Sequence, residues 1–101
     1  MEKKIPKSFR VFATTINIKY ENERLGHEGF LGDCSVNDNQ ISLCGNSKGK
    51  AISLSVITDT FYHEKVHILL DSMGEHKLSQ NEKFVEVFAR LLRQSDKTAK
   101  F

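Results

Sequence analysis

Residue types that bind zinc occur at a characteristic spacing in one segment of the chain, His63-Glu64-Lys65-Val66-His67. Two histidines four residues apart project from the same face of a helix, so two imidazole nitrogens can bind one ion. Zinc lowers the pKa of a bound water to about 7. Glu64 could take a proton from that water and pass it to a leaving amine. The pattern predicts hydrolysis of a peptide bond, with His63 and His67 as zinc ligands and Glu64 as the general base.

A catalytic zinc site needs a third protein ligand and one open position. Glu82 opens a second predicted helix, Glu86 lies one turn later, and His76 lies in the segment between the two helices. A metzincin arrangement is excluded, because Leu70 and Met73 occupy the positions of the glycine and the third histidine of that motif. From the residues alone Glu82, Glu86 and His76 all stay open, with Glu82 preferred.

Other polar residues near the motif could support the chemistry. Asp59 and Asp71 lie one turn before His63 and one turn after His67, where a carboxylate could orient an imidazole. Tyr62 and His76 are candidates for stabilising an oxyanion. Each of these residues has an equally simple interpretation as a solvated or core side chain.

Two helices are predicted in the second half of the chain. Apolar residues recur at spacings of three and four over residues 53–73, and Gly74 follows at the position of a C-terminal cap. Ser79-Gln80-Asn81-Glu82 matches a capping box, which also explains Glu82 without a metal. A second apolar helical face follows it, and the polar residues 95–101 are expected to fray.

The first half of the chain predicts extended structure. Residues 8–20 form one stretch that bends, residues 22–29 form a loop, and residues 30–36 and 41–45 form a hairpin around a turn at 37–40. We expect strand 41–45 to be an exposed edge over the motif helix. An extended peptide substrate could add to that edge as a further strand.

The hairpin register bears on the two cysteines. With Val36 opposite Ile41, Cys34 lies opposite Leu43, and the period of two places the thiols of Cys34 and Cys44 on opposite faces. We therefore expect two free thiols, as is typical of a reducing compartment.

The order of elements predicts an α+β fold, a short twisted antiparallel sheet of about three strands followed by two packed helices. The 101 residues suit a single domain, 1–101, with 1–7 and 95–101 flexible. A net charge of +2 gives little support for nucleic-acid binding, and no apolar run approaches the ~20 residues of a membrane span. The N-terminus shows no secretion signal. We expect a cytoplasmic protein without nucleic-acid or membrane partners.

The chain resembles small H-E-x-x-H proteins of phages and prophages, which are similar to gluzincin metallopeptidases and more remotely to ImmA/IrrE-like proteins. The resemblance is carried by TFYHEKVHILL at 60–70, MGE at 73–75, NEKFV at 81–85 and IPKSF at 5–9. It implies a zincin-like minimal domain that binds Zn2+ through His63, His67 and Glu82, with Glu64 as the base. Lys65 departs from the aliphatic residue usual at its position. No segment resembles the subdomain that walls the cleft of large gluzincins.

Two other functions compete with a peptidase. The main alternative is a catalytically inactive zinc-binding structural or interaction protein of phage or prophage origin, in which the metal holds the helices together. A DNA-binding module is less favoured, because the basic residues near the C-terminus suit a solvated helix end.

Overall fold

The main sheet has the strand order β1-β2-β4-β3 in the computed structural model, which describes residues 5–101. Its strands are β1 (Ser8–Val11), β2 (Thr14–Tyr20), β3 (Gly32–Ser35) and β4 (Gln40–Leu43). The pairs β1–β2 and β3–β4 are antiparallel, whereas β2 and β4 are parallel. The predicted α+β class is confirmed, but the sheet is mixed and four-stranded rather than antiparallel and three-stranded.

The bent stretch predicted at residues 8–20 is a hairpin of two strands. Phe12, in the tight turn between them, has a positive φ of 54°, and Phe9 on β1 lies opposite Ile16 on β2. Apolar residues stand at odd positions in β1 (Phe9, Val11) and at even positions in β2 (Ile16, Ile18). This change arises because the chain reverses between two strands, and not because one strand bends.

The hairpin β3–β4 is confirmed, but its register differs from the predicted one by two residues. Cys34 lies opposite Ile41 instead of Leu43, because a longer turn takes Val36 out of the ladder. The carbonyl of Val36 accepts a hydrogen bond from the amide of Asn39 inside this turn. Both Cys34 and Cys44 are free thiols.

The loop predicted at residues 22–29 is wrong, because this segment forms the helix α1 (Asn22–Glu28). Leu25 anchors the helix and is fully buried, and Gly29 ends it in the left-handed conformation with φ 79°. Glycines at 26 and 29 favoured a loop in the sequence, but one of them is a helix C-cap. After β4, two short strands, β5 (Asn46–Ser47) and β6 (Lys50–Ala51), form a separate two-stranded sheet.

The motif helix α2 (Leu54–Ser72) agrees with the prediction to within one residue at each end. Ser53 caps its N-terminus, where its hydroxyl oxygen accepts a hydrogen bond from the amide of Val56. Gly74 has φ 80° at its C-terminal end, and the amide of Glu75 donates to the carbonyl of Leu70. The chain thus reverses sharply directly after α2.

Two helices follow this reversal, α3 (His76–Ser79) and α4 (Glu82–Thr98). Asn81 is the N-cap of α4, because its side-chain oxygen accepts from the amide of Phe84. The capping box predicted with Ser79 as the cap is therefore wrong. The helix α4 also continues to Thr98, past the expected end at residue 94, and the Tyr62 hydroxyl on α2 donates to Asp96 near that end.

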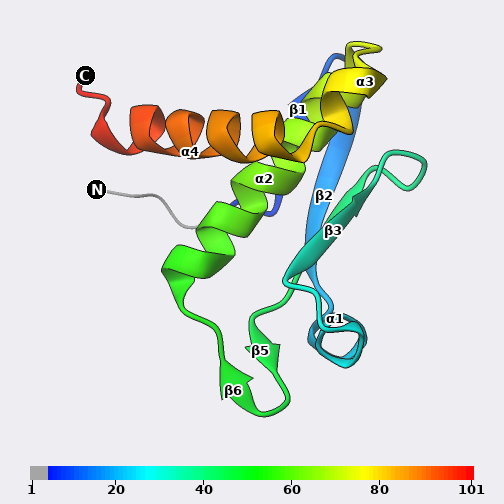
Figure 1. Ribbon diagram of the computed structural model, residues 1–101, viewed down its shortest axis with the longest axis vertical. Coiled ribbons are helices and arrows are strands. Elements are labelled where there is room, and N and C mark those ends of the chain that lie inside the picture. The colour runs from blue at the N-terminus through cyan, green and yellow to red at the C-terminus, as the bar shows by residue number, and fades with distance from the viewer. Residues whose placement is uncertain (1–4) are drawn as a thin grey trace.

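The helix α2 lies between the sheet and α4 and buries a different face against each (Figure 1). One core cluster lies between α2 and the sheet, and a second lies between α2 and α4. The first consists of Ile16, Ile41, Leu43, Ile57, Phe61 and Ile68, and the second of Val66, Leu70, Val85 and Ala89. Ile5 packs against the first cluster, whereas residues 1–4 of the segment expected to be flexible lie outside the described residues.

Lys65 is accommodated on α2 by aromatic rings. Its Nζ lies 5.1 Å from the ring centroid of Phe9, 5.8 Å from that of Phe61 and 5.9 Å from that of Tyr62. Cation–π attraction to these rings accounts for a lysine at this position of α2. Within residues 5–101, no helix has both the length and the apolar character that crossing a membrane requires.

Candidate metal centre

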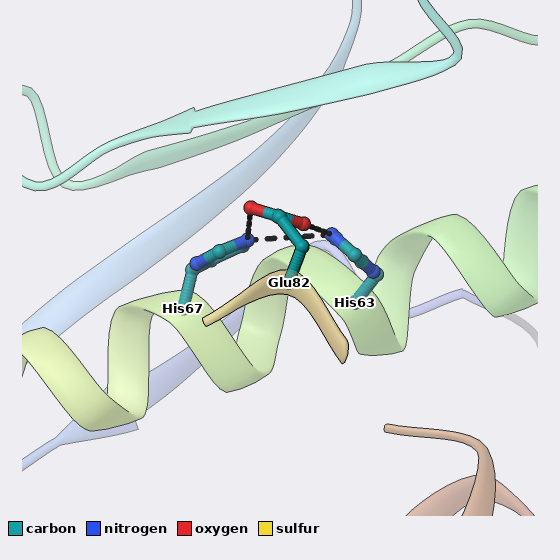
Figure 2. A group of neighbouring side chains, drawn as sticks. All are labelled: His63, His67 and Glu82. Atoms are coloured by element: carbon teal, nitrogen blue, oxygen red, sulfur yellow. Dashed lines mark hydrogen bonds and ion pairs between the residues drawn. The ribbon is translucent and has the colours of Figure 1, made fainter. Parts of the chain in front are cut away.

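The two histidines of the motif and Glu82 meet at one point between α2 and the start of α4 (Figure 2). The Nε2 atoms of His63 and His67 are 3.3 Å apart. The carboxylate of Glu82 places one oxygen 3.2 Å from Nε2 of His63 and the other 3.4 Å from Nε2 of His67. Among the described residues, this is the one group of His, Cys, Asp and Glu side chains that could hold a metal ion.

Local structure explains why these three side chains converge. His63 and His67 are one helical turn apart on α2, on the flank between its two buried faces. Gly74 reverses the chain, α3 bridges the gap, and the cap at Asn81 starts α4 so that Glu82 is its first residue. Two imidazoles and one carboxylate form a donor set that suits zinc and leaves a coordination position open.

Ser79 orients one of the histidines and was missed by the sequence analysis. Its hydroxyl oxygen lies 3.1 Å from Nδ1 of His67, and the serine is only 5% exposed. A protonated Nδ1 that donates to this hydroxyl leaves the lone pair on Nε2 directed at Glu82 and His63. The spacing from Ser79 to Glu82 suggested a helix cap, and no other signal in the sequence pointed to this role.

Glu64 extends from α2 toward β3, where it contacts the thiol of Cys34. Burial raises the pKa of the Glu64 carboxyl, whereas the neighbouring His63 and His67 and the hydrogen bond with Cys34 act in the opposite direction. Burial, followed by the negative charge of Glu64, raises the pKa of the Cys34 thiol. Both effects favour the protonated thiol of Cys34, which can donate to the neighbouring carboxylate.

The other two candidates for the third ligand have partners elsewhere. His76 is exposed, and its Nδ1 lies 3.1 Å from a carboxylate oxygen of Asp71. Glu86 pairs with Arg90 at 2.9 Å on the surface of α4. Neither side chain belongs to the cluster around the two histidines.

The residues considered as supporting groups also take part in other contacts. The carboxylate of Asp59 accepts a hydrogen bond from Arg93 at 2.6 Å, which ties α2 to α4. The Tyr62 hydroxyl donates to Asp96 at 2.8 Å, near the end of α4. Asp71, which was considered for orienting His67, pairs with His76. The group that contacts His67 is Ser79.

The strand beside the site is β3, and not strand 41–45 as predicted. The order β1-β2-β4-β3 places β4 inside the sheet and β3 at its edge. A Cβ at Gly32 would lie 2.6 Å from the Thr60 methyl carbon and 2.9 Å from the carbonyl oxygen of Ser42, so only glycine lets β3 approach α2 this closely. Arg24 of α1 holds β3 from its other side through two hydrogen bonds to Asp33, of 2.9 and 3.1 Å.

The chain matches none of the protein-family models, curated proteins or solved structures with which it was compared. The chemistry and geometry of the site therefore carry the functional interpretation.

Proposed function

We propose that this protein is a zinc-dependent metallopeptidase of gluzincin-like form, in which His63, His67 and Glu82 bind Zn2+ and Glu64 is the general base. The observation that carries the proposal is the convergence of the two Nε2 atoms and the Glu82 carboxylate, with all three ligand atoms within 4.8 Å of one another. Ser79 supports it, because a hydrogen bond to Nδ1 of His67 makes Nε2 the metal-binding nitrogen.

Hydrolysis by this site would depend on a bound zinc as a Lewis acid and on Glu64 as a proton acceptor and donor. A bound zinc supplies a Lewis acid that polarises the scissile carbonyl and increases the acidity of water. Glu64 lies next in sequence to His63 but outside the ligand cluster, so its carboxylate is available to accept a proton from the attacking water and to give it to the leaving amine. Burial, which raises its pKa, brings its proton affinity closer to that needed near neutral pH.

The edge strand β3 supports an extended peptide as the substrate. It contacts α2 through Cys34 and Glu64 and has one edge without a partner strand among the described elements. A peptide added to this edge forms backbone hydrogen bonds that require little side-chain selectivity. The side chain of Glu82 is 69% exposed and that of His63 is partly exposed, which leaves the ligand cluster open to a substrate of this kind.

Substitution of Glu64 by Gln tests the catalytic part of the proposal. The variant keeps the zinc ligands, so we expect bound zinc to stay at the wild-type level while cleavage of an unstructured peptide library, followed by mass spectrometry, falls about 10²- to 10⁴-fold. Glu23→Gln is the matched control, because it makes the same change at an exposed residue of α1 outside both the ligand cluster and the cavity beside it, and it keeps activity. A Glu64→Gln variant that cleaves as fast as wild type would falsify the assigned base.

A zinc-binding structural protein of phage or prophage type is the second candidate. The observation that favours it is that the histidines lie on α2 and Glu82 lies on α4, so a metal ion here would join two helices of a small domain. Loss of helical circular dichroism upon chelation, together with no cleavage of any library peptide, would favour this candidate over the peptidase.

A further inference from the structure

A cavity of about 400 Å³ adjoins the proposed catalytic residues. His63 and Glu64 form part of its lining, so the cavity and the ligand cluster share a wall. The hollow is open to solvent, and its lining comes from the segment before β3, from α2 and from α4. Its volume lies within the range of about 300–1,000 Å³ that is usual for sites that enclose a ligand.

The walls of the cavity are largely apolar. Phe30 and Leu31 line it and remain 57% and 48% exposed, so these two neighbouring side chains present apolar surface at the hollow. Ala89 and the Thr60 side chain complete the apolar lining from α4 and α2. Gly32 keeps this opening in place, because it lets the start of β3 lie against Thr60.

Apart from Glu64, the proposed base, the charged side chains of the lining are already paired. Glu86 forms an ion pair with Arg90 at 2.9 Å, and Asp59 forms one with Arg93 at 2.6 Å. The paired charges offer little attraction to a single charge on a ligand. The cavity therefore favours an apolar group over a charged one.

We propose that this cavity binds a large apolar side chain, such as that of Leu, Met or Phe, of the residue next to the scissile bond of the substrate. The position follows from the shared wall, because Glu64 and His63 border both the cavity and the proposed site of hydrolysis. The inference rests on the proposed function and adds to it the substrate class.

The test is the affinity of the zinc-loaded protein for the hydroxamates of N-acetylleucine, N-acetylaspartate and N-acetylglycine, measured by titration calorimetry. The hydroxamate group chelates zinc in all three, so affinity differences report the side chain. We expect the leucine compound to bind at least about tenfold more tightly than the glycine compound, and the aspartate compound to gain nothing.

Leu31→Lys should abolish the preference for leucine and favour aspartate, because it places a cation in the apolar wall. Val87→Lys is the control. Val87 is 51% exposed on α4 outside the cavity, so this variant keeps the leucine preference. Equal affinity for the three hydroxamates, or no binding of any of them to the zinc-loaded protein, would overturn the inference. Failure of the proposed function has a different result: the side-chain preference is present, but no peptide is cleaved.

Discussion

At the scale of single residues, the most informative contact is the one between Ser79 and His67. The imidazole is held on both sides, by the buried hydroxyl at Nδ1 and by the partners of the ligand cluster at Nε2. A histidine whose second nitrogen is fixed in this way loses less rotational freedom when it binds a metal, and its basicity rises. We therefore propose Ser79 as a positioning residue of the candidate metal site.

We predict that Ser79→Ala lowers zinc affinity about 10- to 100-fold, because His67 loses the partner that selects its tautomer. Competition with a chelating dye measures this constant directly. Ser95→Ala, which removes the hydroxyl of an exposed serine on α4, serves as the control and leaves the affinity unchanged. Equal zinc affinities for Ser79→Ala and wild type would show that the hydroxyl does not orient His67.

The contact between Cys34 and Glu64 makes a prediction about pH. Burial raises the thiol pKa, and the adjacent carboxylate raises it further because it disfavours a second negative charge. Glu64→Gln removes that charge, so the thiol pKa should fall and more thiolate should be present at a given pH. In a Cys44→Ser background, iodoacetamide should then alkylate Cys34 faster at each alkaline pH at which the protein stays folded.

Glu86→Gln provides the matched control for this experiment. The charge of Glu86 lies on α4 and is not among the charges that raise the pKa of the Cys34 thiol. Its alkylation profile should superimpose on that of the Cys44→Ser parent. An unchanged profile in the Glu64→Gln variant would contradict the packing of β3 against α2 that this structure shows.

At the scale of elements, the site depends on how closely β3 approaches α2. Gly32→Ala introduces a Cβ that meets the Thr60 methyl carbon at 2.6 Å and the Ser42 carbonyl oxygen at 2.9 Å. We expect the variant to lose about 1–3 kcal/mol of unfolding free energy in urea titrations. Gly26→Ala in α1 is the control, since its Cβ makes only ordinary contacts, the nearest with Ser47 of β5 at 3.6 Å. Equal stabilities for the two variants would show that Gly32 is not a close-packing position.

The sequence predicted those elements whose signals are local. The spacing of His63 and His67 defines one helical face without any knowledge of the rest of the fold, and Ser53 and Gly74 mark the ends of α2. Ser79 was assigned as a cap because the capping-box pattern does not distinguish it from a serine buried against a histidine. Glu82 was preferred among three candidates from its place at the start of the second helix, and the resemblance strengthened that preference. The residues alone left Glu86 and His76 open, because the path through α3 that brings Glu82 to the histidines is tertiary structure.

The sheet was predicted less well, because strand order depends on contacts that are distant in sequence. The parallel pairing of β2 with β4 joins residues such as Ile18 and Ile41, which are far apart in sequence. No tight turn connects these strands, so no local sequence signal predicts the pairing. Leu25 makes α1 a helix by filling a fully buried position that tertiary packing creates. The identity of the edge strand follows from this order, so β4 was assigned to the edge where β3 lies.

At the scale of the whole molecule, two core clusters support a fold that does not require the metal ligands. The clusters around Phe61 and around Val85 contain none of His63, His67 or Glu82. The ligand cluster lies on the open flank of α2, between α4 and the edge of the sheet, and the apolar cavity adjoins it. A metal ion bound there should stabilise a structure that is already formed.

The most direct test of the account is the zinc content of the purified chain, measured by elemental mass spectrometry after equilibration with micromolar zinc and removal of the excess. We expect about one zinc per chain in wild type. The metal should be lost in His67→Ala and weakly held in Glu82→Ala, whereas the controls His76→Ala and Glu86→Ala should match wild type. A wild-type chain that takes up no zinc would contradict the metal site, and with it the proposed peptidase.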